Sequence, residues 1–156
     1  MILIQVPGFG EITLKNIVFD FNGTMAVQGK LIDGVRERLT RLAENLKVYV
    51  LTADTFGKAA KELEGLPCKL HILSGGNEDA QKESYVQKLG AESCCAFGNG
   101  NNDKKMLRAA KVGIAVIEGE GCSSQAVLSS DIIVKSILNG LDMLLDPNRL
   151  KATTRF

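Results

Sequence analysis

The sequence lacks a charge excess and long apolar runs, and its start lacks the pattern expected of a signal peptide. Its 156 residues carry 19 Lys and Arg against 18 Asp and Glu, a formal net charge of +1. This balance argues against a chain that coats nucleic acid or an anionic membrane. No window approaches the roughly 18 consecutive apolar residues of a transmembrane helix, and the start MILIQVPGFG has no charged region followed by a long apolar core. We expect a cytoplasmic protein with no nucleic-acid or membrane partner.

Cysteine and histidine are too few and too scattered to indicate a metal–thiolate centre. Cys94 and Cys95 are adjacent in an apolar segment, and Cys68 and Cys122 are isolated. Because no pair has the spacing of a metal site, buried and reduced thiols are favoured over disulfides, and a redox role for Cys94–Cys95 is the least favoured. The single histidine, His71, lies in the apolar stretch KLHIL and is interpreted as a structural strand residue.

Short apolar runs alternate with amphipathic stretches along the chain. This alternation predicts right-handed βαβ crossovers, and hence one α/β domain with a three-layer, Rossmann-like parallel sheet covered by helices on both faces. The predicted strands are 17–19, 48–51, 70–73, 94–97, 112–117 and 132–134, and the predicted helices are about 34–45, 56–64, 78–89, 102–110, 122–129 and 137–145.

The two ends of the chain lie outside this alternation. Residues 1–14 predict an N-terminal β-hairpin around the turn PGFG, residues 15–146 the core, and residues 147–156 a tail. The last six residues, KATTRF, offer nothing to bury and are expected to fray. Ile2, Leu3 and Val6 form a candidate edge for a homo-oligomer, because edge strands invite pairing.

Polar residues follow the predicted strands where each strand ends, which is where ligands bind in an open parallel sheet. A strand-end carboxylate that attacks phosphorus, with small hydrogen-bonding groups and a lysine around it, suits phosphoryl transfer. No Walker loop is present, so a P-loop nucleotide-binding protein is excluded. The residues are Asp20, Asn22, Gly23 and Thr24, then Thr52, Ala53 and Asp54, then Lys82 after the loop SGGN, then Asn99, Asn102 and Asp103 in GNGNND.

Four segments in order resemble the motifs of the haloacid dehalogenase (HAD) superfamily: FDFNGT, LTADT, the Lys82 of QKESYVQKLG, and GNGNNDKKML. They are most similar to the phosphorylation domain of P-type ATPases, whose pattern is D-K-T-G-T, T-G-D, a lysine before V-x-x-L, and G-D-G-x-N-D. The chain resembles the small free-standing "soluble P-type ATPase" proteins of that superfamily. The resemblance extends from residue 17 to about residue 117, which is most of the chain.

The resemblance implies a role for each matched residue. Asp20 is the implied nucleophile, Lys82 the charge stabiliser, and Mg²⁺ the implied cofactor. The implied catalytic set is Asp20, Asn22, Thr24, Thr52 and Lys82; the phosphate-binding set is Asn22, Gly23, Thr52, Ala53 and Lys82; the metal ligands are Asp20, the backbone carbonyl of Asn22, Asn99 and Asp103.

Two positions depart from the family pattern. Asn22 stands where phosphatases of the superfamily carry an acid and P-type ATPases a threonine. An amide cannot transfer a proton, and a general acid or base at this position usually contributes a factor of about 10²–10⁴ to the rate. Asn99 stands where metal-binding members usually carry aspartate; it brings no charge, so weak Mg²⁺ binding is expected. The sequence therefore predicts a slow phosphohydrolase or phosphotransferase. The alternative is an attenuated pseudoenzyme that serves as a phosphate-binding or protein-interaction module.

Structural interpretations stand beside these roles. Asn22–Gly23 alone is a strong turn signal. Lys88 competes with Lys82 on one predicted helix, and Thr52 can simply end a core strand. Asp54 is favoured as a helix N-cap, and Asp103 can either orient the lysine, hold the cation or begin the next helix.

Only the eight residues MAVQGKLI separate Thr24 from the helix that begins near Asp33. This leaves room for a small hairpin flap but none for a cap domain. An open, capless site fits a macromolecular or phosphoprotein substrate, or a neighbouring subunit that serves as the lid. The expected partner is a phosphorylated substrate, either a small molecule or a phosphoprotein.

Overall fold

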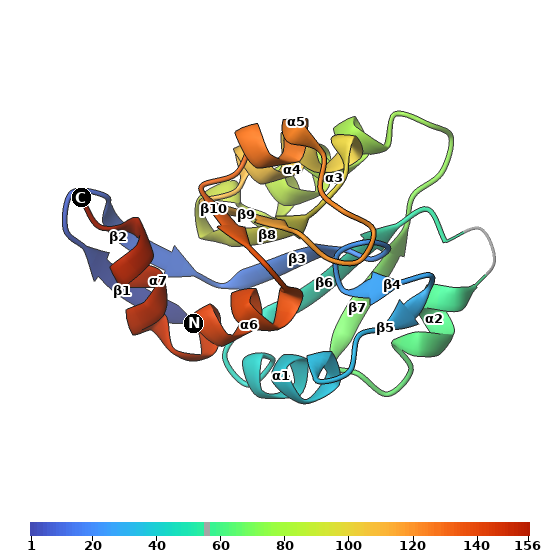
Figure 1. Cartoon of the computed structure of the whole chain (residues 1–156), viewed down its shortest axis with the longest axis horizontal. Coiled ribbons are helices and arrows are strands. Elements are labelled where there is room, and N and C mark those ends of the chain that lie inside the picture. Colours follow the sequence, from blue (N-terminus) through green and yellow to red (C-terminus); the bar gives the residue numbers. More distant parts are fainter. Residues whose placement is uncertain (55–56) are drawn as a thin grey trace.

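The computed structural model describes residues 1–54 and 57–156, and its centre is a six-stranded parallel sheet in the order β10-β9-β8-β3-β6-β7 (Figure 1). After β3 the chain adds β6 and β7 on one side, then crosses over and adds β8, β9 and β10 on the other. The order therefore reverses at β3 and β8, the position at which open α/β sheets bind ligands. The strands are β3 (Asn16–Asp20), β6 (Lys47–Thr52), β7 (Cys68–Ile72), β8 (Cys94–Gly98), β9 (Val112–Val116) and β10 (Ile132–Val134).

Helices cover both faces of the sheet, which confirms the predicted three-layer fold class. In Figure 1, α3, α4 and α5 lie on one face, and α1 and α6 on the other. The helices are α1 (Val35–Leu42), α2 (Lys58–Glu62), α3 (Glu78–Leu89), α4 (Lys104–Ala109), α5 (Ser124–Leu128), α6 (Ile137–Leu145) and α7 (Pro147–Thr154), with 3₁₀ turns at Ala91–Ser93 and Asn101–Asp103. Of the predicted helix 56–64, residue 56 lies outside the described residues.

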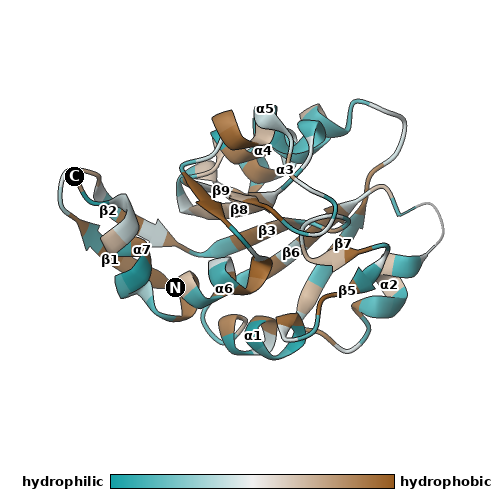
Figure 2. Ribbon diagram, viewed as in Figure 1, coloured by the Kyte–Doolittle hydropathy of each residue, from teal (hydrophilic) through white to brown (hydrophobic). Residues whose placement is uncertain are grey.

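The central strands are buried on both faces, as parallel strands between helical layers must be. All five residues of β3 are buried; Ile17 and Phe19 belong to the apolar cluster under α1 and α6, and Val18 to the cluster under α3 and α4. Phe19 stacks on Phe97 of β8 with ring centroids 4.9 Å apart. Figure 2 shows the same distribution, with β9 and β10 largely hydrophobic and α2 largely hydrophilic. The strand that carries Asp20 is thus held between two cores.

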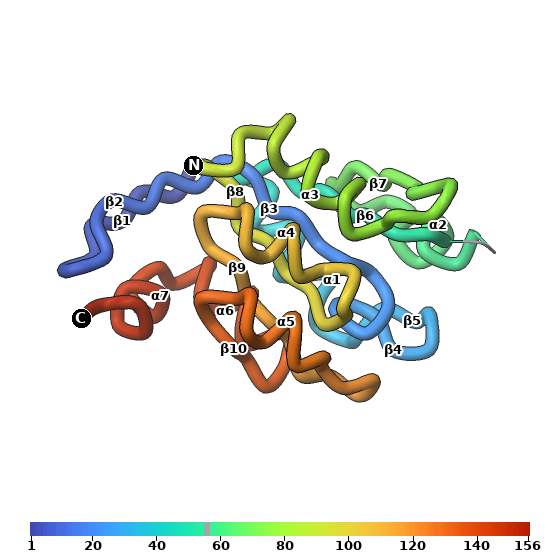
Figure 3. Tube along the Cα trace, turned by 90° about the horizontal axis from the view of Figure 1, so that it is seen from above, coloured from blue at the N-terminus to red at the C-terminus, as the bar shows by residue number. Residues whose placement is uncertain are grey.

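The N-terminal hairpin forms as predicted, from β1 (Ile2–Val6) and β2 (Gly10–Leu14). It is packed against α7 rather than left open, and Figure 3 shows the two side by side. Ile2 and Val6 are buried within the chain, whereas Leu3 is 58% exposed. Ile2 and Val6 are therefore covered within the chain, and the homo-oligomer edge at this hairpin stays a prediction.

The C-terminal tail is also more ordered than the sequence suggested. Asp146 ends α6 and caps α7: its Oδ1 accepts from the N–H of Asn148 at 3.3 Å, and Pro147 is the first helical residue. Leu150 of α7 is fully buried, and the Phe156 N–H donates to the carbonyl of Pro7. The prediction that residues 151–156 fray is wrong, because α7 continues to Thr154 and the chain end is tied to the hairpin turn.

A small flap follows β3, as the short spacer predicted. It consists of β4 (Ala26–Val27) and β5 (Lys30–Leu31), which pair antiparallel. Within the described residues, no helix combines the length and the apolar character needed to cross a membrane.

Candidate active site

A cavity of about 670 Å³ lies at the carboxyl edge of the sheet, where β3, β6 and β8 end. It is lined mainly by polar side chains and by glycines. Among the predicted site residues, Asp20, Asn22, Thr52, Ala53, Lys82 and Asn99 line it; Gln28, Lys58, Glu78, Asn102 and Glu120 line it as well. The ends of β3, β6 and β8 and the helix α3, which the sequence placed at one edge, therefore meet around a single space.

Lys82 joins two buried carboxylates at the floor of this cavity. Its Nζ lies 2.7 Å from Oδ1 of Asp20 and 2.6 Å from Oδ1 of Asp103, and the side chain is only 1% exposed. Lys82 and Val86 are one helical turn apart on α3, and both are buried against the sheet. Lys88, the competing lysine, is exposed. The structure thus brings Lys82, not Lys88, to Asp20.

Burial sets the protonation of this group of charges. Burial, with the negative charge of Asp103, raises the pKa of Asp20 to about 7, although Lys82 and the Thr24 hydroxyl oppose the shift. Burial by itself lowers the pKa of Lys82, but the charges of Asp20 and Asp103 overcome it and hold that pKa above its usual value. The lysine therefore stays charged, and Asp20 is the group that exchanges its proton near neutral pH.

Asp103 has both carboxylate oxygens engaged by the protein. Oδ1 accepts from Lys82, and Oδ2 accepts from the backbone N–H groups of Asn99 at 2.9 Å and Gly100 at 2.8 Å. Gly98 makes room for it, since a Cβ there would lie 2.5 Å from the Asp103 Cβ. The geometry supports the orientation of Lys82 by Asp103, and Asp103 directly precedes α4, as a residue that begins the next helix must. Oδ1 carries a single contact, so the metal-ligand role stays a prediction.

The loop after Asp20 is a tight turn and part of the site at once. The Thr24 hydroxyl lies 3.1 Å from Oδ2 of Asp20 and 3.2 Å from Oδ1 of Asn99. Gly23 has φ +81° and donates its N–H to the carbonyl of Ala26 at 2.7 Å. Its predicted phosphate-binding role is therefore not supported, because that N–H is already used to close the turn.

The end of β6 supplies a hydroxyl and a helix cap. Thr52 is buried at the last position of the strand and faces the cavity, with Ala53 beside it. Asp54 accepts from the N–H groups of Lys58 at 2.9 Å and Ala59 at 3.0 Å, at the start of α2. The prediction that Asp54 caps this helix is confirmed.

The architecture resembles that of solved phosphatases. The 3-deoxy-D-manno-octulosonate 8-phosphate phosphatase of Moraxella catarrhalis, in complex with magnesium, phosphate and its sugar acid, superposes with a TM-score of 0.66 at 20% identity, over 89% of this chain and 90% of that one. The cobalt-bound phosphatase of the same specificity from Haemophilus influenzae gives a TM-score of 0.71 at 15% identity, over 85% of this chain and 88% of that one. At these identities the likeness establishes the fold.

The sequence comparisons point to the same kind of protein as the fold. A family model described as haloacid dehalogenase-like hydrolase matches residues 76–121, the segment that contains Lys82, Asn99 and Asp103. In this segment the chain is similar to the HAD superfamily. It is 49% identical over 87 residues to an uncharacterised protein of Methanocaldococcus jannaschii, which covers 56% of this chain and 84% of that protein. It is 32% identical over 108 residues to a copper-transporting ATPase of Schizosaccharomyces pombe, over 67% of this chain but 12% of that protein. The predicted superfamily is confirmed.

The oxygen atoms gathered at this site are of the kind that a hard cation prefers. Oδ2 of Asp20 and Oδ1 of Asn99 converge on the same Thr24 hydroxyl, and the backbone carbonyl of Asn22 lies in the same loop. Such oxygen donors are those that Mg²⁺ prefers. Among the described residues, no three His, Cys, Asp or Glu side chains are grouped to hold a metal ion. The donor set fits Mg²⁺ chemically, but Asp20 is the one carboxylate in it.

Two contacts at the mouth of the cavity were missed from the sequence. Oε1 of Glu120, in the loop after β9, accepts from the Gln28 N–H at the tip of the flap at 2.8 Å. Nδ2 of Asn102 donates to Oε2 of Glu78 at 2.7 Å. The sequence IEGEG lies directly after β9, but no local pattern indicates which residue of the flap it meets.

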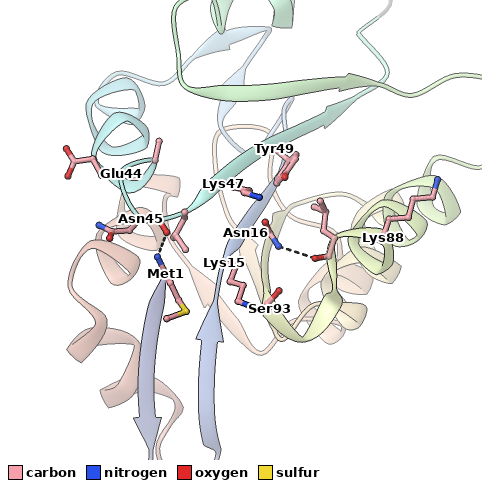
Figure 4. A pocket seen from close by; sticks show the side chains of 12 residues that line it. Met1, Lys15, Asn16, Glu44, Asn45, Lys47, Tyr49, Lys88 and Ser93 are labelled. Atoms are coloured by element: carbon pink, nitrogen blue, oxygen red, sulfur yellow. Dashed lines mark hydrogen bonds between the residues drawn. The ribbon is translucent and has the colours of Figure 1, made fainter.

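A second cavity, of about 600 Å³, lies at the opposite edge of the sheet (Figure 4). Lys15, Asn16, Lys47 and Lys88 line it, and Nδ2 of Asn16 donates to the carbonyl of Leu89. None of the predicted site residues lines this second cavity. The carboxyl edge thus remains the candidate active site.

Proposed function

We propose that the protein is a Mg²⁺-dependent phosphohydrolase or phosphotransferase that works through an aspartyl-phosphate on Asp20. The observation that carries the proposal is the Asp20–Lys82–Asp103 array in the cavity where the sheet order reverses. The fold shared with phosphatases supports the reaction class. The partial match to a copper-transporting ATPase supports the P-type ATPase branch, in which the phosphorylated aspartate persists.

In the first step a carboxylate oxygen of Asp20 forms a bond to phosphorus while the bond from phosphorus to the leaving oxygen breaks. The Lys82 ammonium, the Thr52 hydroxyl and the backbone around Asn22 and Ala53 hold the phosphoryl oxygens. Asp103 positions Lys82 through the 2.6 Å contact. The attacking form is the carboxylate, so in the metal-free protein the reactive fraction grows as pH rises through about 7.

The second step is slow because nothing at position 22 can move a proton. Water attacks the phosphorus of the aspartyl-phosphate, phosphate leaves and the Asp20 carboxylate is restored. Asn22 is exposed beside the nucleophile, but an amide neither protonates the leaving group nor activates the water. A phosphoryl group on Asp20 is therefore passed on to water or to another acceptor at a low rate.

Mg²⁺ would be held by Asp20, the backbone carbonyl of Asn22 and Oδ1 of Asn99. When bound, it neutralises charge on the phosphoryl oxygens and favours the ionised form of Asp20. Asp103 stays the predicted fourth ligand, because its Oδ1 carries only the Lys82 contact and keeps a second lone pair.

The substrate class follows from the open, polar cavity. With a two-stranded flap as the local cover, a phosphorylated small molecule or a phosphoprotein can reach Asp20. A cytoplasmic location and assembly into a homo-oligomer remain predictions. The second candidate function, a phosphate-binding module without turnover, is favoured by the amides at positions 22 and 99.

Hydrolysis of p-nitrophenyl phosphate and acetyl phosphate, with and without Mg²⁺, tests the proposal. We expect slow Mg²⁺-dependent turnover that Asp20→Asn abolishes and Asn22→Asp increases by about 10-fold or more. Intact mass is checked in parallel, because deamidation of Asn22 would create the acid after purification. Phosphate binding without turnover above the Asp20→Asn background would favour the module.

A further inference from the structure

Asn99 is held at both atoms of its amide. Nδ2 donates to the carbonyl of Gly121 at 3.0 Å, and Oδ1 faces the Thr24 hydroxyl at 3.2 Å. Because a backbone carbonyl only accepts hydrogen bonds, the atom that faces Gly121 must be a donor. A carboxylate at position 99 would place an oxygen against that carbonyl, so the hydrogen bond would be replaced by repulsion.

The carbonyl of Gly121 cannot easily turn away from this contact. Gly121 has φ +79° and closes a turn by donating its N–H to the carbonyl of Glu118 at 2.8 Å. The N–H of Ser123 donates to the backbone carbonyl of Asn99 at 2.8 Å. The loop 118–123 is therefore fastened to Asn99 from two sides, by backbone and by side chain.

The space around the amide is equally specific. A Cβ on Gly23 would lie 2.3 Å from Nδ2 of Asn99, so the amide is packed against the bare backbone of the Asp20 loop. Within the loop 118–123, Oε1 of Glu120 accepts from the N–H of Gln28 at the tip of the flap. Figures 1 and 3 show the loop after β9 beside the flap formed by β4 and β5. Asn99, the loop 118–123 and the flap thus form one connected chain of contacts over the cavity.

We propose that the Asn99 amide is a latch that fastens the loop 118–123, and through Glu120 the flap, over the Asp20 cavity. Asn99 is then a positioning residue selected as an amide, rather than a neutral remnant of a metal-binding aspartate. This proposal rests on the proposed function in one respect: the proposed function makes the cavity beside Asn99 the reaction site. The contacts themselves exist without substrate or metal.

Hydrogen exchange, read by mass spectrometry on metal-free protein in chelator, tests the latch. For Asn99→Asp we expect about fivefold to tenfold faster exchange in peptides that cover 118–123 and 26–31, the loss that one broken hydrogen bond implies. Peptides from β3 and α3 should keep the wild-type rate, which separates release of the latch from general loss of stability.

Asn22→Asp is the matched control, because it adds the same charge beside Asp20 at an exposed position. It should leave exchange in the loop and the flap unchanged. Glu120→Ala cuts only the outer contact, so it should speed exchange in the flap even if Asn99→Asp does not fold. The proposal is overturned if both segments of Asn99→Asp exchange at the wild-type rate, or if the increase is uniform and includes β3. It is also overturned if Asn22→Asp shows an equal increase, or if the flap of Glu120→Ala shows no change. Because no turnover is measured, a failure of the latch is distinguishable from a failure of the proposed function.

Discussion

Replacement of Lys82 by methionine tests the electrostatic account of the site most severely. Methionine is similar in length and fills the space under α3, so little cavity forms and the lost charge dominates. Lys82 is 1% exposed and contacts Asp20 and Asp103 at 2.7 and 2.6 Å. Removing one partner of a buried ion pair costs about 3–5 kcal/mol. We expect a loss of this size in the free energy of unfolding at about pH 8.

The loss should depend on pH in a defined direction. The pKa of Asp20 is already raised to about 7 in the folded protein, and without Lys82 it rises further. A raised folded-state pKa means that stability is retained at low pH and lost as pH rises through that pKa. The cost of Lys82→Met should therefore shrink towards about pH 5, where Asp20 is protonated.

Urea unfolding followed by circular dichroism at about pH 5, 6.5 and 8 provides the measurement. Lys88→Met is the control on the same helix; its side chain is exposed, and a change within about 0.5 kcal/mol is expected. If Lys82→Met costs no more than Lys88→Met at about pH 8, or costs the same at every pH, the reasoning is refuted.

Three further predictions follow from single contacts. Asp20→Asn removes a carboxyl whose pKa is about 7 when folded and about 3.9 when unfolded. The free energy of unfolding of the variant should exceed that of wild type by up to about 4 kcal/mol above pH 7. The two values should converge near pH 4, as thermal melts across that range will show. Leu150→Ala should cost about 2–5 kcal/mol in urea unfolding, because α7 buries this side chain; Leu128→Ala, 74% exposed, is its control, and equal losses would contradict the docking of α7. Asp54→Ala should cost about 1 kcal/mol and speed hydrogen exchange at Lys58 and Ala59, whereas unchanged exchange there would exclude the cap.

The parts of the fold that were predictable are those with a local cause. The helix Glu78–Leu89 has the predicted bounds, because acidic residues open its first turn and Gly90, with φ +88°, ends it. An apolar run that ends on a carboxylate placed Asp20 at the end of β3. Lys82 was favoured over Lys88 by the resemblance, which places a lysine before V-x-x-L; in the structure Lys82 and Val86, one turn apart, are both buried.

The parts that were missed depend on contacts between distant segments. The predicted helix 137–145 ends before Pro147 as expected. Pro147 also begins α7, however, and only the packing of Leu150 shows that this second helix is stable. The bond from Gln28 to Glu120 joins residues 92 positions apart. The engagement of both Asp103 oxygens likewise depends on where Lys82 and the Asn99 loop lie in the folded chain.

The most direct test of the central claim is to look for the covalent intermediate. Wild type and Asp20→Asn are incubated with acetyl phosphate and Mg²⁺, quenched in acid, and analysed by intact mass and peptide mapping. We predict one added phosphoryl group in wild type, on the peptide that contains Asp20, none in Asp20→Asn, and a shorter-lived adduct in Asn22→Asp. Hydrolysis that persists in Asp20→Asn, or a phosphoryl group on another residue, would contradict the account.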